Sequence, residues 1–163
     1  MRSVVVYGSR SGNTRRIAEA IAAALEAFGP VRLLAAEDAS ATVWDHCDLL
    51  VVGGPTERRH LTPPVDAFFG RLPVGALRGI RAAAFDTRLP WPRVLSGSAA
   101  TGIARRLRDA GADLVVPPES FKVSQRPRLL YGELERAPLW ARAVAEAARR
   151  SPASPSVGHP VAA

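Results

Sequence analysis

Residues 4–21, VVVYGSRSGNTRRIAEAI, lead from a run of β-branched residues through a polar, glycine-containing loop into apolar residues at helical spacing. A strand joined to a helix in this way can hold an anion, because the first N–H groups of a helix lack intrahelical partners and its dipole favours negative charge. Ser9, Ser11 and Thr14 add hydroxyl donors to this loop. Gly12 lets the backbone approach a ligand closely. We therefore predict a phosphate cradle between the strand and the helix.

Better-known phosphate loops do not match these residues. A P-loop needs Gly-Lys followed by Ser or Thr, and no lysine occurs before Lys122. Gly8 and Gly12 lack the G-x-G-x-x-G spacing of a dinucleotide fingerprint. A response-regulator receiver would have acidic residues directly after the first strand, where this chain has Gly8-Ser9. A tight connection without a ligand remains the structural alternative to a phosphate cradle.

Length and composition indicate one folded domain. The chain has 163 residues, which predicts a domain over 1–150, while the proline-containing stretch 151–163 has no apolar period and is predicted to be disordered. No apolar run approaches the ~20 residues of a membrane span, and no cleavable apolar leader is visible, so we expect a cytoplasmic protein without membrane partners. A single cysteine, Cys47, excludes an internal disulfide and multi-cysteine metal sites, and we expect it to be a half-buried structural residue.

The formal charge of +7 comes almost entirely from arginine. Arginine pairs such as Arg15-Arg16 and Arg105-Arg106 fall on different predicted elements, without the interleaved aromatic residues of a nucleic-acid surface. We therefore expect no nucleic-acid partner. No nucleophile and base occur at catalytic spacing and no metal-ligand cluster is visible, so neither catalytic nor metal-binding residues are predicted.

Strands and helices alternate along the chain, which predicts a parallel sheet with helices on both faces. The expected strands are 4–7, 31–35, 49–53, 81–85 and 113–116. The expected helices are 14–28, a short one between 38 and 47, one opening at Pro63 or Pro64, one capped by Ser96 or Ser98 and ending at Gly111, and 132–150. An irregular stretch is expected around 117–123, and Trp44 and Trp140 are assigned to the core.

Ligands of such sheets bind beyond the carboxyl ends of the strands, so three loops are expected to meet there. They span 8–14, 53–61 and 86–94. The motif Tyr7-x-Ser9-x-x-Gly12-x-Thr14 resembles the FMN-phosphate loop of the flavodoxin family, and the later stretches GGPT (53–56), AAAFDTR (82–88), SGSAA (96–100) and PPESF (117–121) extend the resemblance. It implies a flavodoxin-like three-layer sandwich with a five-stranded parallel sheet in the order 2-1-3-4-5, binding FMN.

The resemblance also implies which residues would hold the flavin. Backbone groups of the second and third loops would meet the ring edge, Trp91 is the aromatic residue available to stack on it, and His60 could cover the other face. Glu57 stands where flavodoxins commonly have an aromatic residue. The predicted cofactor-binding residues are Ser9, Arg10, Ser11, Gly12, Asn13, Thr14, Pro55, Thr56, Glu57, Arg58, His60, Asp86, Thr87, Arg88 and Trp91.

The function implied by the resemblance is electron transfer by a protein that binds FMN. Two alternatives stay open: an FMN-dependent NAD(P)H/quinone oxidoreductase, and a flavodoxin fold without flavin that serves as an interaction module. Arg58, Arg59, His60 and Arg88 make the flavin-facing loops basic, which predicts an acidic redox partner protein.

Overall fold

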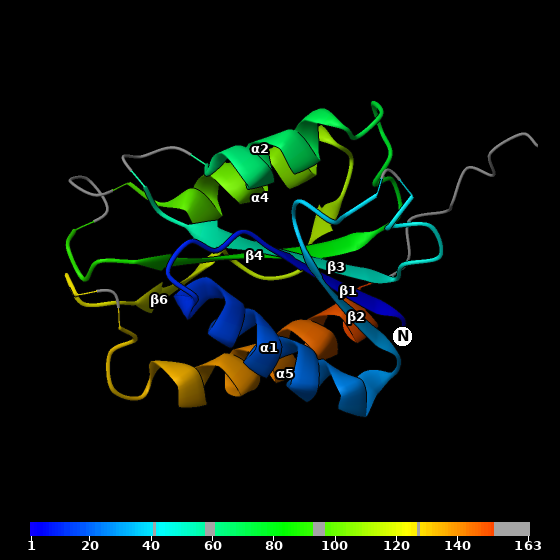
Figure 1. The fold of residues 1–163 in the computed structure, drawn as a ribbon. Helices are drawn as coiled ribbons and strands as arrows, with labels where there is room; N and C mark the ends of the chain where they lie inside the picture. Colours follow the sequence, from blue (N-terminus) through cyan, green and yellow to red (C-terminus); the bar gives the residue numbers. More distant parts are fainter. Residues whose placement is uncertain (41, 58–60, 93–96, 127, 152–163) are drawn as a thin grey trace, which may run out of the picture.

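The computed structural model describes residues 1–40, 42–57, 61–92, 97–126 and 128–151. A parallel sheet forms its centre, in the strand order β2-β1-β3-β4-β5, with β6 also paired to β4 (Figure 1). The strands are β1 (Ser3–Tyr7), β2 (Val31–Ala35), β3 (Leu49–Pro55), β4 (Arg81–Arg88), β5 (Asp113–Leu114) and β6 (Glu119–Lys122). The predicted fold class and strand order 2-1-3-4-5 are confirmed.

The fifth position of the sheet is occupied by two short strands. Ala82 of β4 lies beside Leu114 of β5, and Phe85 of β4 lies beside Glu119 of β6. Between these two pairs the chain advances three residues in β4 but five residues from β5 to β6. The segment between β5 and β6, which contains Pro117, therefore bulges out of the sheet. The irregular stretch expected around 117–123 is therefore wrong in part, because pairing to β4 resumes after the bulge.

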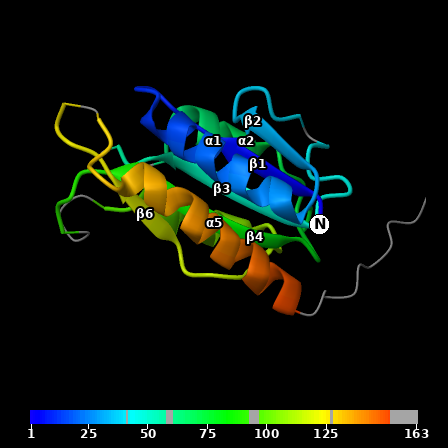
Figure 2. The same cartoon turned by 90° about the horizontal axis from the view of Figure 1, so that it is seen from below.

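Helices cover both faces of the sheet (Figures 1 and 2). The helices α2 (Pro63–Gly70) and α4 (Ala99–Asp109) lie on one face, and α1 (Asn13–Leu25) and α5 (Glu133–Arg150) lie side by side on the other. A short 3-10 helix, η1 (Glu26–Phe28), extends α1. Each face has its own buried apolar cluster, because the central strands are apolar on both sides.

Turns replace the short helix expected between Asp38 and Cys47. The described residues there form separate turns, each closed by a hydrogen bond to the carbonyl three residues earlier, such as Val43 N–H to Ser40 O (3.2 Å). His46 adopts a left-handed conformation with φ of 62°. A helix cannot pass through that conformation. Trp44 is nevertheless buried against Phe68, as expected for a core residue.

Trp140 also packs in the core, edge-on to Phe85 and Phe121. No helix in the described ranges is long and apolar enough to cross a membrane.

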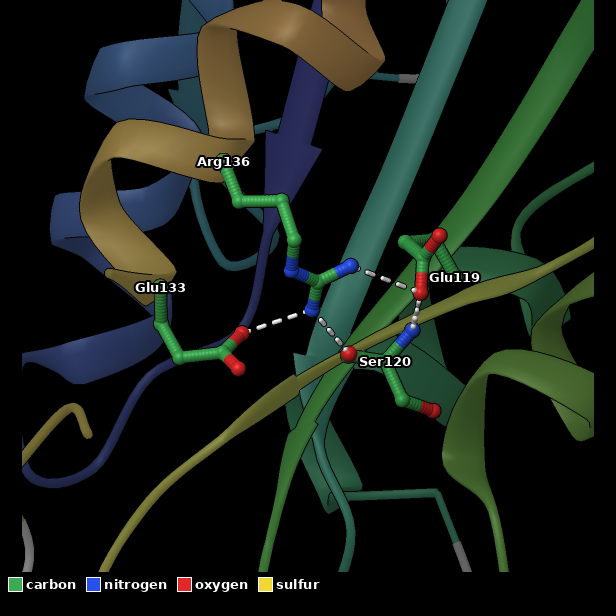
Figure 3. Close-up of polar contacts among 4 residues, drawn as sticks. All are labelled: Glu119, Ser120, Glu133 and Arg136. Atoms are coloured by element: carbon green, nitrogen blue, oxygen red, sulfur yellow. Dashed lines mark hydrogen bonds and ion pairs between the residues drawn. The ribbon is translucent and has the colours of Figure 1, made fainter. Parts of the chain in front are cut away.

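Arg136 fastens the start of α5 to β6 (Figure 3). Its guanidinium pairs with Glu119 (3.1 Å) and Glu133 (2.6 Å), and it donates a hydrogen bond to the Ser120 carbonyl (2.6 Å). The same group lies 4.6 Å from the centre of the Phe121 ring. These contacts fix the chain on both sides of the segment that joins β6 to α5.

Candidate functional site

The first loop is shaped by hydrogen bonds around Ser9. Its Oγ accepts hydrogen bonds from the Gly12 N–H (3.1 Å) and the Arg15 N–H (3.4 Å), so its hydroxyl proton is not used in these two bonds. Gly12 precedes α1 with φ of 84°, a conformation that favours glycine. The loop sequence thus turns the chain sharply into the helix and keeps a hydroxyl donor at its start.

Within the described residues, three backbone donors at the start of α1 have no partner. The N–H groups of Ser11, Asn13 and Thr14 donate to no other described residue. A side chain added at Gly12 would meet nothing within 4 Å, so the loop is not covered on the side to which that side chain would point. Donors of this kind suit a phosphate group, which supplies several oxygen acceptors and negative charge at the positive end of the helix dipole.

Thr14 joins the first loop to the third. Its Oγ1 lies 2.7 Å from Oγ1 of Thr87, and both side chains are buried. Thr87 is in β4, whose carboxyl end leads into the third loop. The Thr14 hydroxyl, which was predicted to bind phosphate, therefore already has a protein partner and a structural role.

Glu57 and Thr56 connect the second loop to the other two. The Glu57 carboxylate pairs with Arg10 of the first loop (Nη1 to Oε2, 3.0 Å), and both side chains are partly exposed. The Thr56 N–H donates to the Thr87 carbonyl (2.9 Å). All three predicted loops thus contact one another, as the topology requires.

Asp86 faces the protein interior. Its Oδ2 accepts hydrogen bonds from Thr56 Oγ1 (2.9 Å), Ser98 Oγ (2.7 Å) and the Ala100 N–H (2.9 Å). The Thr56 hydroxyl also accepts from the Ala99 N–H (2.8 Å), so Asp86 and Thr56 together cap α4. The fully buried Asp86 side chain therefore positions the second loop against α4, and its Oδ2 is occupied by protein donors.

The third loop is anchored through its backbone. Arg88 is buried and donates from Nη1 to the Trp91 carbonyl (2.9 Å). The Trp91 side chain is 48% exposed, which leaves it accessible to a ligand or a partner. Pro55, at the end of β3, is half-buried. Arg58 and His60, also predicted as flavin contacts, lie outside the described residues.

Sequence reasoning did not assign Ser98 to this site. It was one of two candidate helix caps, and the structure shows that its Oγ accepts from the Thr101 N–H (3.4 Å) while donating to Asp86. The combination of a buried aspartate after one strand and an N-cap serine before the next helix was the available signal. In the described part of the chain, no group of three or more His, Cys, Asp or Glu residues is placed to hold a metal ion.

Cys47 lies at the opposite end of the sheet, at the amino end of β3. Its thiol donates to the Leu49 carbonyl (3.0 Å) and is partly buried, as expected for a structural cysteine. Burial raises the pKa of this thiol to about 12. A thiol with that pKa is protonated at neutral pH and is a poor nucleophile.

Comparisons with known proteins agree with this fold. Flavodoxin 2 from Bacillus cereus is 25% identical, with a TM-score of 0.75, and the match covers 90% of this chain and 99% of that chain. A flavodoxin from the domain Archaea is 24% identical, with a TM-score of 0.73, covering 91% and 99%. Flavodoxin 1 from Bacillus cereus is 18% identical, with a TM-score of 0.75, covering 90% and 98%. The latter two likenesses, below 25% identity, bear on the fold alone.

A comparison with curated proteins gave no match. The family model of the flavodoxin domain matches residues 4–86, which include the first two loops and the strands from β1 to most of β4. This match covers half of the chain. The chain therefore belongs to the flavodoxin-domain family.

Proposed function

We propose that this protein binds FMN without a covalent bond and transfers electrons. The single observation that supports the proposal best is the set of free donors at the start of α1: three backbone N–H groups, the Ser9 hydroxyl and an open approach at Gly12. These groups fit the terminal phosphate of FMN in number and in charge. Bound FMN would supply the redox chemistry.

The residues of this chain would hold and orient the cofactor. Ser9, Ser11 and Asn13 would donate to the phosphate, while the backbone of Thr56 and Glu57 would lie beside the ring edge. Trp91 would cover one face of the ring. The contacts between Thr14 and Thr87 and between Arg10 and Glu57 hold the three loops in a fixed relationship, which lowers the cost of ordering them around a ligand.

Titration of the apoprotein with FMN and with riboflavin tests the phosphate assignment. We expect FMN to bind at least ~10-fold more tightly than riboflavin, which lacks the phosphate, because each charge-assisted hydrogen bond contributes about 1.5–3 kcal/mol. Ser9→Ala should reduce FMN affinity and leave riboflavin affinity nearly unchanged. Equal binding of the two flavins would exclude the assignment.

A turnover assay separates electron transfer from enzyme activity. An electron carrier should accept electrons from a reduced redox protein and show little turnover of a quinone with NAD(P)H. Rapid quinone turnover would instead assign an oxidoreductase, and absence of flavin binding would indicate an interaction module.

A further inference from the structure

The segment between β6 and α5 displays two neighbouring apolar side chains to solvent. Leu130 is 37% exposed and Tyr131 is 105% exposed, and no other large hydrophobic residues so exposed are adjacent in the described sequence. Arg126 and Arg128, both exposed, precede them. We call these four residues the Tyr131 surface. Two exposed apolar residues that are adjacent in the sequence offer apolar area to an interaction partner.

This surface is held in place by backbone hydrogen bonds. The Val123 N–H donates to the Arg88 carbonyl (2.9 Å), and the Leu130 N–H donates to the Lys122 carbonyl (2.9 Å). An antiparallel bridge also pairs Val123 with Leu129. A partner that binds here would therefore order little additional chain, which favours association.

The charge of the Tyr131 surface is positive. Among the described residues, neither Arg126 nor Arg128 forms an ion pair. Of the acidic side chains on the flanking elements, Glu119 and Glu133 are engaged by Arg136 (Figure 3), and Glu135 in the first turn of α5 is exposed. The two arginines are thus left to attract an anionic surface.

The Tyr131 surface borders the candidate flavin site. Lys122 at the end of β6 pairs with Arg88 at the end of β4, so the segments that follow the two strands leave the same edge of the sheet side by side. The segment after Arg88 carries the half-exposed Trp91. A protein bound to the Tyr131 surface would therefore lie next to the loops assigned to FMN.

We propose that the Tyr131 surface docks an acidic redox protein that exchanges electrons with the flavin. The inference rests on the proposed function. Tyrosine and arginine are the side chains enriched at the energetic centres of protein interfaces, and acidic groups on the partner would complement Arg126 and Arg128. An anionic membrane is a weaker match, because such surfaces recruit clusters of about 4–8 basic residues and this one has two.

A reduced plant-type [2Fe–2S] ferredoxin, chosen for its acidic surface and low potential, serves as the probe. In the measured step, its cluster loses one electron and the bound FMN accepts it. Stopped-flow rates are compared at several salt concentrations for wild type, Arg126→Glu/Arg128→Glu and Tyr131→Ser. The control Arg32→Glu/Arg78→Glu makes the same charge change near the amino ends of the strands, away from the flavin loops. Calorimetric binding of the ferredoxin to each apoprotein provides a readout that needs no flavin.

We expect the charge reversal to slow electron transfer at low salt by about 10-fold or more and to flatten its salt dependence, with a change below ~2-fold in the control. Tyr131→Ser should weaken binding at every salt concentration. Equal effects of the two charge reversals, or unchanged binding in both Tyr131-surface variants, would overturn the proposal. The proposal would also be overturned if Arg126→Glu/Arg128→Glu lost binding to phosphatidylserine vesicles but kept its binding to ferredoxin. Failure of wild type to bind FMN would refute the proposed function alone, since the calorimetric comparison still tests the docking surface.

Discussion

Thr14 and Thr87 are 73 residues apart in the sequence, yet their hydroxyl oxygens lie 2.7 Å apart in a buried contact between α1 and β4. One hydroxyl donates and the other accepts, and the pair links the loop assigned to phosphate with the strand that leads into the third loop. Replacing either residue would leave a buried hydroxyl without its partner.

We predict that Thr14→Val and Thr87→Val each lower the free energy of unfolding by about 1–2 kcal/mol, because each leaves one buried hydroxyl unpaired. The double variant removes both polar groups, so it should lose less than the sum of the two single losses. Urea unfolding of the four proteins in a double-mutant cycle measures this coupling. Strictly additive losses would show that the two hydroxyls do not interact in solution.

The ion pair between Arg10 and Glu57 should tune the redox potential of bound FMN. One charge at ~7 Å contributes about 2 kcal/mol at an effective dielectric near 20, and exposure and salt reduce this figure substantially. Glu57→Gln removes a negative charge, so we predict a midpoint potential higher by about 20–40 mV. Spectroelectrochemical titration measures the change.

The matched variants of this pair test the sign of the effect. Arg10→Gln should lower the potential, and Arg10→Gln/Glu57→Gln should lie close to wild type, because the net charge is then restored. A Glu57→Gln potential at or below that of wild type would refute the electrostatic explanation.

Trp91 is predicted to stack on the flavin ring. Trp91→Ala should weaken FMN binding by about 1–2 kcal/mol, since aromatic stacking is lost. The free energy of unfolding should change by less than about 0.5 kcal/mol, because the side chain is half exposed and the hydrogen bond from Arg88 reaches its backbone. FMN titration and urea unfolding give the two values, and full FMN affinity in the variant would assign Trp91 to structure instead.

Cys47 makes stability depend on pH in the alkaline range. Burial raises the pKa of its thiol to about 12 in the folded protein, from an ordinary value of 9.0. Between these values the unfolded chain loses the thiol proton while the folded protein retains it, so stability falls as pH rises from about 9 to about 12. Wild type should therefore lose unfolding free energy more steeply than Cys47→Ala over this range, as measured by urea unfolding at each pH. Parallel pH profiles would contradict the burial of the thiol.

The architecture was predictable because its signals are local and repeated. Apolar runs separated by loops predicted the central strands, and the loop at 8–14 predicted the end of the sheet at which a ligand is expected. The short helix expected between Asp38 and Cys47 is absent from the described residues because single turns there satisfy the backbone, and His46 interrupts any helical path. The strand β6 was not predicted, because it follows two consecutive prolines in the sequence. Its formation depends on pairing with β4, which the local sequence does not indicate.

The site was predictable at the level of loops, not of side-chain partners. Gly12 and Ser9 shape the predicted loop, through a left-handed backbone conformation and a hydrogen bond that the Ser9 hydroxyl accepts, and their contact with a phosphate stays a prediction. Asp86 was expected at the start of the loop 86–94, but β4 continues to Arg88, and the contact of Asp86 with Ser98 and α4 depends on three-dimensional packing. The pairing of Arg10 with Glu57 is likewise non-local, and only the folded chain brings the two charges together.

The division of the fifth position into β5 and β6 also protects the edge of the sheet opposite β2. A long, regular edge strand exposes a continuous row of backbone donors and acceptors to which another chain can add. Here the edge is formed by the short strands β5 and β6, and the bulge interrupts it. The bulge contains Pro117, which has no backbone N–H to donate. The bulge should therefore discourage growth of the sheet into intermolecular aggregates, and deleting residues 117 and 118 to make the strand continuous should increase aggregation at high protein concentration.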